Sequence, residues 1–197
     1  MSGLDAQARH GALSGAEGPS DWVRRWSHLI AAGATVLDVA CGSGRHVHWF
    51  AQRGCQVTGV DRNAQALAPL HGLAELVTAD IERDAWPLAG RQFDAVVVTN
   101  YLWRPLLPVL IASVAPGGVL IYETFAIGQQ TLGKPSNPDF LLRPGELLIA
   151  TQGLHVVAFE DGFTSVPERF VQRIVAVRVD AVRIEADASL PARHVLG

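Results

Sequence analysis

This chain lacks most of the features that mark secreted, membrane-bound and nucleic-acid-binding proteins. It has two cysteines, Cys41 and Cys55, which form neither a Cys-x-x-Cys metal motif nor a disulfide framework and are typical of reduced cytosolic thiols. Lys134 is its single lysine, and 16 basic residues against 19 acidic ones leave a net charge of −3. Such a balance argues against a broad surface that neutralises phosphates.

A long uninterrupted apolar run is also missing. The most apolar stretch, residues 105–122, is cut by three prolines and a Gly-Gly pair, and is too interrupted to span a bilayer. The N-terminus shows no basic start followed by an apolar core. We therefore expect no signal peptide and a cytoplasmic location.

The remaining composition predicts one folded domain. The chain has 197 residues, 49% of them hydrophobic, and a mean hydropathy of +0.20, so it can bury a full core. Residues 1–19 are rich in Ala, Gly and Ser without an apolar period, which predicts a flexible N-terminal tail. We expect the domain over residues 20–180 and a C-terminal tail over 181–197.

Short apolar runs alternate with helical segments along the domain. Two runs near its end, residues 153–162 and 169–180, are separated by a loop too short for a crossover and predict an antiparallel hairpin. The pattern indicates an α/β fold, a Rossmann-like seven-stranded sheet that is mostly parallel, with one antiparallel strand in a C-terminal hairpin and helices on both faces. The other predicted strands are residues 35–40, 56–60, 74–79, 93–98 and 119–125.

Capping residues and helix breakers predict where the helices begin and end. A last helix begins at the Arg-Pro-Gly-Glu of residues 143–146, with Pro144 in its first turn. It follows a long polar loop rich in Gly and Pro, of the kind that serves as a lid or binding loop. The other predicted helices run from Ser20 to Gly33, over residues 45–53, from Asn63 to Pro69, and from Pro105 to residues 116–118.

A glycine turn follows the first predicted strand, in the stretch VLDVACGSGRH of residues 36–46. Gly42 and Gly44 lie where a strand's carboxyl end leads into a helix, the usual place of a ligand crevice in an open α/β sheet. Glycine lets the backbone approach a ligand without a Cβ in the way. An ordinary strand-to-helix turn is the structural alternative.

The next strands also end in polar residues. Asp61 comes 17 residues after Gly44, where a carboxylate can accept both hydroxyls of a ribose, and Asp80 follows the third strand. Together these strand ends outline a site for an adenosine-type ligand. The NAD-binding fingerprint would need a third glycine at the position of Val47. A nicotinamide enzyme would also need a separate substrate domain, for which the chain has no room.

At this point the sequence resembles the class I S-adenosylmethionine-dependent methyltransferases, and most of all the small bacterial stand-alone enzymes of the tellurite-resistance type. The resemblance covers residues 20–180 and departs from the family where Ala40 replaces the first glycine of the glycine motif. It rests, in order, on VLDVACGSG, VTGVDRN, TADIE, FDAVVVTN, APGGVLIYETF and the closing hairpin.

The resemblance implies S-adenosyl-L-methionine as cofactor and a role for each matching residue. Gly44 completes the glycine turn, and the other matching residues each contact one part of the cofactor. By this resemblance the methionine end of the cofactor lies by Asp38 and Gly42, and Asp61 holds the ribose. The adenine lies along Arg62 and is bound by Asp80 and the backbone of Ile81. The reacting methyl group lies beside Thr99 and Asn100.

Several of these residues have an equally simple structural reading. Asp61 and Asp80 could cap the segments that follow them, and Asp38 could bind loop amides. His46 and His48 are two apart on a helix and do not face each other, so we predict no metal site. Arg143 could bind an anionic acceptor or form a surface ion pair. Two tryptophans of the first helix, Trp22 and Trp26, are predicted in the core.

No catalytic residue is unambiguous, and the candidates are Asn100, Tyr101 and Glu123. Tyr101, Trp103 and Arg104 either line the acceptor site or pack against a helix, and Glu123 with Thr124 either orients an acceptor or fixes the following loop. Transfer from a sulfonium needs alignment rather than a metal, and a base only when the acceptor must lose a proton.

We therefore expect direct in-line methyl transfer to a small-molecule acceptor by a monomer or homodimer, with no membrane partner. An S-adenosylmethionine-binding module without turnover, such as a sensor or a subunit of a complex, is the alternative. A nicotinamide oxidoreductase is disfavoured by Val47. A nucleic-acid acceptor is disfavoured because TNYLW lacks the Asn-Pro-Pro-aromatic signature and no basic stripe is present.

Overall fold

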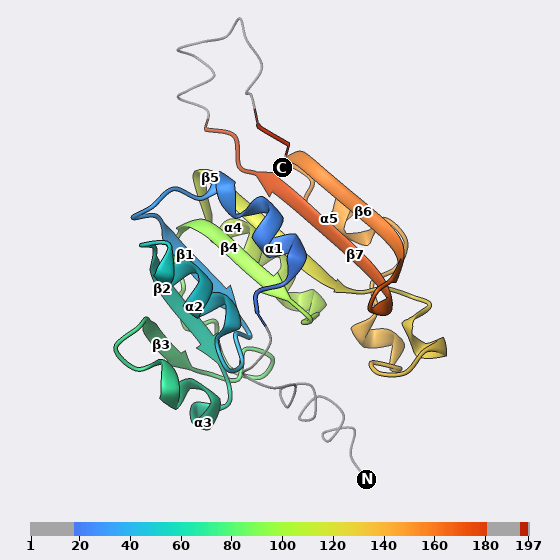
Figure 1. Cartoon of the computed structure of the whole chain (residues 1–197), viewed down its shortest axis with the longest axis horizontal. Helices are drawn as coiled ribbons and strands as arrows, with labels where there is room; N and C mark the ends of the chain where they lie inside the picture. The colour runs from blue at the N-terminus through green and yellow to red at the C-terminus, as the bar shows by residue number, and fades with distance from the viewer. Residues whose placement is uncertain (1–17, 181–193, 197) are drawn as a thin grey trace, which may run out of the picture.

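The computed structural model describes residues 18–180 and 194–196. In this part of the chain, seven strands form one sheet in the order β3-β2-β1-β4-β5-β7-β6 (Figure 1). The first five strands pair in parallel, and β7 runs antiparallel to both β5 and β6. The strands are β1 (Thr35–Val39), β2 (Gln56–Asp61), β3 (Glu75–Thr78), β4 (Phe93–Thr99), β5 (Val114–Phe125), β6 (His155–Ser165) and β7 (Glu168–Val177).

The predicted fold class is confirmed, with one antiparallel strand in a C-terminal hairpin. The two predicted tails, residues 1–19 and 181–197, lie largely outside the described residues and stay predictions. Within the described residues, no helix is long and apolar enough to cross a membrane.

Helices lie on both faces of the sheet (Figure 1). The helix α1 (Asp21–Trp26) begins at Ser20, whose side-chain oxygen accepts from the Val23 N–H as the sequence predicts. Likewise Asn63 accepts from two N–H groups of the third helix. The other α-helices are α2 (Arg45–Gln52), α3 (Ala64–Leu67), α4 (Leu107–Ala112) and α5 (Glu146–Ala150). Short 3-10 turns are η2 (Ser27–Leu29), η3 (Ala68–Leu70), η4 (Arg104–Leu106), η5 (Gln129–Thr131) and η6 (Pro138–Phe140).

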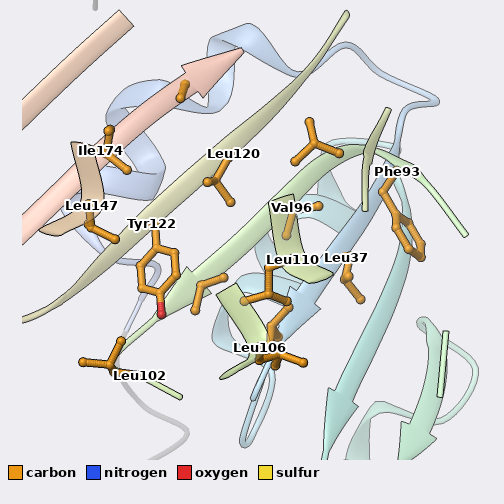
Figure 2. Packing of buried hydrophobic residues seen from close by; sticks show 14 of the residues in the cluster. Leu37, Phe93, Val96, Leu102, Leu106, Leu110, Leu120, Tyr122, Leu147 and Ile174 are labelled. Atoms are coloured by element: carbon orange, nitrogen blue, oxygen red, sulfur yellow. The ribbon is translucent and has the colours of Figure 1, made fainter. Parts of the chain in front are cut away.

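Alternation along the strands divides the core into two layers because successive side chains point to opposite faces. On β1, Val36 packs in the layer under α1 and α2, whereas Leu37 packs in the layer under α4 and α5. Figure 2 shows the second layer, in which strand residues meet the helical Leu106, Leu110 and Leu147. Its labelled strand members are Leu37, Phe93, Val96, Leu120, Tyr122 and Ile174.

Two predicted helix boundaries are wrong, the end of the first helix and the beginning of the last. The first helix gives way to the 3-10 turn η2 at Ser27, well before Gly33. The Ser27 hydroxyl donates to the Val23 carbonyl at 2.6 Å and accepts from the Trp49 Nε1–H at 2.8 Å, a side-chain bond that competes with helical pairing. The last helix begins at Glu146 rather than near Pro144, because Gly145 has φ 69°, outside the helical region.

Two predicted strands are longer in the structure. The segment 116–118, read as a helix stop, lies inside β5, where the pairing with β4 shifts register between Phe93 and Ala95. A Cβ at Gly118 would lie 2.9 Å from the Asp94 carbonyl oxygen, so glycine is needed where the strands approach this closely. In the hairpin the Ser165–Glu168 pairing leaves a two-residue turn, shorter than predicted.

Candidate functional site

Polar side chains occupy the carboxyl edge of the sheet on the face covered by α1 and α2. Asp61 ends β2, Asp38 is next to last on β1, and Thr99 ends β4 directly opposite Glu123 of β5. In a strand, residues separated by an even number of positions point to the same face. Each of these four residues follows, at an even spacing, a residue of the core layer beneath α1 and α2, so all four side chains lie on that face. Those core members are Val36, Val57, Val97 and Ile121.

The glycine turn between β1 and α2 uses three left-handed residues. Gly42 has φ 55°, and a Cβ there would meet nothing within 4 Å, so this position borders open space. Gly44 has φ 79°, and its Cβ would lie 2.4 Å from Leu70 Cδ1. Gly44 is therefore required by packing, whereas Gly42 leaves room for a ligand. Ala40 has φ 52°, a conformation that costs an alanine about 1–2 kcal/mol.

Asp61 ties this turn to the second strand. Its Oδ2 accepts from the Gly42 N–H at 2.8 Å, and its Oδ1 accepts from the Asn63 N–H at 2.8 Å. Asn63 rather than Asp61 caps the helix that follows. Each carboxylate oxygen can accept a further hydrogen bond, so Asp61 can still accept from the two hydroxyls of a ribose. This ribose-binding role stays a prediction.

Asp38 is a buried carboxyl group with an unpaired oxygen. Its residue is 1% exposed, and among the described residues its Oδ2 has no hydrogen-bond partner. Burial, with a smaller contribution from Asp61, raises its pKa to about 7, while Arg45 and the Val47 N–H oppose that rise. An orphaned carboxylate oxygen at the base of a turn that borders open space at Gly42 fits a ligand that carries an ammonium group.

His46 is part of the buried structure rather than of the open crevice. Its Nε2 accepts from the Ser20 N–H at 3.1 Å, and its Nδ1 lies 3.9 Å from Asp38 Oδ1. Burial, helped by Arg45, lowers its pKa to about 3, so it is neutral and forms no ion pair with Asp38. His48 is exposed. The described ranges contain no group of three or more His, Cys, Asp or Glu that could hold a metal ion.

The segment after β3 adds two further acidic residues at this edge, Asp80 and Glu82. Asp80 Oδ1 accepts from the Glu82 N–H at 3.2 Å, so part of its predicted capping role is present. Ile81 is buried and Arg62 is exposed. Sequence reasoning missed Glu82, which is half-buried and whose pKa is raised chiefly by burial. Its only signal was its place beside Asp80.

The residues after β4 lie at the centre of the edge. Arg45 Nη2 donates to Thr99 Oγ1 at 3.4 Å, which joins the start of α2 to β4. Asn100 is exposed with φ 54°, and its N–H donates to the Glu123 carbonyl at 2.9 Å. Asparagine tolerates this left-handed conformation better than most residues, and such outliers cluster at functional sites.

Tyr101 is held in place from below. The Tyr122 hydroxyl donates to the Tyr101 carbonyl at 2.8 Å from the core layer shown in Figure 2. Burial, followed by the charge of Glu82, raises the pKa of the Tyr101 hydroxyl. A phenol with a raised pKa stays protonated at neutral pH, so the Tyr101 hydroxyl can donate a hydrogen bond but does not act as a base.

Glu123 is fully buried and belongs to an ion-pair network that the sequence did not predict. Its Oε2 lies 3.0 Å from Arg173 Nη1 and 3.7 Å from Arg169 Nη2, and its Oε1 has no hydrogen-bond partner in the part of the chain that the structure describes. The Arg173 guanidinium also lies over the Trp22 ring, at 5.1 Å from its centroid.

Other predicted candidates lie elsewhere. Arg104 forms an ion pair with Glu146 at 2.6 Å, and donates to the carbonyls of Asp139 and Leu141, so it anchors the long loop rather than an acceptor. The exposed Arg143 contributes its backbone: its N–H donates to Glu146 Oε2, and its carbonyl accepts from Gln172 Nε2. Its role stays a prediction. Thr124 is buried, Trp103 is half-buried against the α4 side of the core, and Trp22 and Trp26 are core residues as predicted.

Comparison with known proteins shows which proteins this chain is similar to. Residues 36–118 match the methyltransferase domain family. A ubiquinone biosynthesis O-methyltransferase of Paraburkholderia phytofirmans is 37% identical over 114 residues, which are 52% of this chain and 48% of the relative. A tRNA U34 carboxymethyltransferase of Pseudoalteromonas translucida is 28% identical over 176 residues, which are 80% of this chain and 54% of the relative. The chain thus spans about half the length of these curated relatives.

Solved structures agree on the fold. The crystal structure of TehB from Haemophilus influenzae superposes with a TM-score of 0.63 at 19% identity, over 80% of this chain and 61% of that one. At this identity the likeness shows the fold alone.

Proposed function

We propose that this chain is a class I S-adenosylmethionine-dependent methyltransferase and that it transfers a methyl group to a small-molecule acceptor by direct in-line displacement. Its cofactor is S-adenosylmethionine, which when bound supplies an electrophilic methyl group on a positively charged sulfur. The acceptor attacks that carbon along the line of the breaking bond. The protein's task is to bind, align and exclude water.

One observation carries the proposal. Asp38 places a buried, unpaired carboxylate oxygen beneath a turn where Gly42 borders open space. An unpaired charge in the interior is costly, and the ammonium group at the methionine end of the cofactor would offset that cost. We assign this end to Asp38 and Gly42, with Gly44 shaping the turn through its packing on Leu70.

The nucleoside end of the cofactor extends along the same edge. Asp61 is held by two backbone N–H groups in an orientation that leaves capacity on both oxygens for the ribose hydroxyls. We assign the adenine to the next strand end, where Asp80 accepts from its amino group and the exposed Arg62 lies along its ring. Ile81 offers its backbone there.

The acceptor side lies over β4 and β5. Thr99 and Asn100 border the reacting methyl in this proposal, with Arg45 holding Thr99. Tyr101 orients the acceptor and Glu123 is the candidate base. Alignment alone can lower a barrier by roughly 7–11 kcal/mol in favourable cases, so one weakly acting base is sufficient.

A small molecule is the proposed acceptor because the net charge is −3. The curated relatives are named for ubiquinone biosynthesis and for a tRNA nucleotide, and a nucleic acid would need a cationic surface that this composition does not favour. A cytoplasmic location, a monomeric or homodimeric state and the absence of a metal stay predictions.

Isothermal titration with S-adenosylhomocysteine tests the proposal. The wild type should bind, and Asp61→Ala should bind at least tenfold more weakly, because one carboxylate loses two hydroxyl partners. Asp84→Ala removes an exposed carboxylate near the same edge and is the matched control, which should bind as the wild type does. Equal affinities for Asp61→Ala and Asp84→Ala would remove the ribose assignment.

A further inference from the structure

The ion-pair network at the end of β5 joins three neighbouring strands of the sheet. Glu123 on β5 lies opposite Arg173 on β7, which lies opposite Glu160 on β6. Arg173 donates to both carboxylates, at 3.0 Å to Glu123 Oε2 and 2.7 Å to Glu160 Oε2, and Arg169 Nη2 lies 3.7 Å from the same Glu123 oxygen. Arg25 Nη1 also lies 3.5 Å from Glu160 Oε1, so three guanidinium groups meet two carboxylates, and the third lies at the exposed Glu160 rather than at Glu123.

Two buried atoms of this network lack a hydrogen-bond partner among the residues described. One is Glu123 Oε1, on a side chain that is 1% exposed, and the other is Arg169 Nε. Each such atom costs free energy when it is left unpaired, so its presence in a native interior calls for a reason. Oε1 can only accept a hydrogen bond and Nε can only donate one.

The unpaired oxygen belongs to the acceptor side of the site. Glu123 is the direct register neighbour of Thr99, and its carbonyl accepts from the Asn100 N–H. These are the residues proposed to border the reacting methyl. The side chains of Arg169 and Arg173 are 21% and 15% exposed, so both arginines that contact the buried Glu123 extend to the surface.

We infer that Glu123 and Arg169 form the acceptor subsite, that this subsite takes a neutral hydroxyl group, and that it discriminates against carboxylates and other oxyanions; the inference rests on the methyl transfer proposed above. A hydroxyl donates its proton to Glu123 Oε1, accepts from Arg169 Nε–H with one lone pair, and keeps a second lone pair for attack. A neutral amine has a single lone pair and cannot do both. An oxyanion would place a negative charge against Oε1.

The transfer step then balances through Glu123. The hydroxyl proton passes to Oε1 while the oxygen lone pair forms the new C–O bond. The C–S bond breaks with its electron pair on sulfur, which leaves a neutral thioether. Glu123 returns its proton to solvent after the methylated product leaves.

Fluorine NMR binding measurements test the subsite without knowledge of the natural acceptor. The probes are 4-fluorophenol, 4-fluoroaniline and 4-fluorobenzoate, titrated into protein loaded with S-adenosylhomocysteine. The wild type should bind the phenol about tenfold more tightly than the benzoate. Glu123→Gln should bind the phenol about tenfold more weakly and gain affinity for the benzoate, because the new amide presents an N–H donor where an acceptor stood.

Glu160→Gln is the matched control. It removes a carboxylate from the same Arg173 but leaves Oε1 of Glu123 untouched, and its exposed position makes it a mild change. It should keep the preference for the phenol. A wild type that prefers the benzoate, that binds none of the probes, or whose preference changes equally in both variants would overturn the inference.

The wild-type preference tests the inference even if Glu123→Gln fails to fold. Titration of S-adenosylhomocysteine into the same samples separates the two levels of the argument. Failure of the wild type to bind it contradicts the proposed function itself. Normal binding of it together with a preference for the benzoate contradicts the hydroxyl subsite alone.

Discussion

Asp38→Asn should stabilise the unliganded protein at alkaline pH and weaken cofactor binding. The pKa of Asp38 is raised from its ordinary value of 3.8 to about 7, chiefly by burial. Below pH 3.8 the group is protonated in both the folded and the unfolded chain and contributes nothing. As the pH rises toward 7 the unfolded chain ionises first, so the folded state binds more protons and loses stability.

The magnitude follows from the pKa values. Each pKa unit corresponds to about 1.4 kcal/mol, so the full rise costs the folded protein about 4 kcal/mol above pH 7, and about 2–3 kcal/mol of this accrues between pH 5 and 8. Asparagine removes this cost and still accepts from the Val47 N–H. For a chain of this size, the variant's melting temperature relative to wild type should rise by about 4–12 °C between those two pH values.

Thermal unfolding of both proteins at pH 5 and pH 8, without ligand, measures the effect. Asp84→Asn, an exposed position, is the control for a general change in net charge. S-adenosylhomocysteine should stabilise the wild type more strongly than Asp38→Asn, because only the carboxylate can pair with its ammonium group. A variant that is destabilised equally at both pH values would refute the reasoning and make Asp38 a structural group held ionised by Arg45 and Val47.

Further predictions concern the turn, the acceptor loop and metals. Ala40→Gly should raise the free energy of unfolding by about 0.5–1 kcal/mol, because a φ of 52° strains an alanine. Urea unfolding measures this free energy, and a decrease would contradict the strain. Gly44→Ala should lose about 2–4 kcal/mol in the same assay through its collision with Leu70, and a neutral result would show that Leu70 can move aside. Tyr122→Phe should cost about 1–2 kcal/mol by leaving the Tyr101 carbonyl unpaired, with wild-type stability as the contrary outcome. Binding of S-adenosylhomocysteine should survive EDTA, and a loss restored by added metal would reverse the reading of the histidines.

Local sequence was sufficient for the order of elements and for the positions of the glycine turn and Asp61 at strand ends. The apolar runs predict strands because the central strands β1, β2, β4 and β5 carry runs of residues that are buried on both faces. The Ser20 and Asn63 caps act on N–H groups two or three residues away. The glycine turn and Asp61 follow from their places at strand ends, since parallel strands bring their carboxyl ends to one edge. These signals need no knowledge of distant residues.

Other boundaries depended on distant residues. The first helix ends early at Ser27, whose hydroxyl meets Trp49 of another helix. The strand β5 extends back through Gly118 because β4 lies against it. Neither contact has a signature within a few residues of the boundary it sets, so the local pattern misplaced both ends.

The sequence by itself determined the α/β alternation, the glycine turn and a carboxylate at each of the first strand ends, because periodicity and chain spacing are local properties. Only the tertiary structure decided which groups meet. Glu123 and Arg173 are 50 residues apart and pair because the antiparallel β7 inserts beside β5 in one register. Ser20 reaches His46, and Leu70 makes Gly44 necessary, through packing between elements. A shift of one residue in any strand register would turn these side chains to the opposite face, which is why no local pattern encodes them.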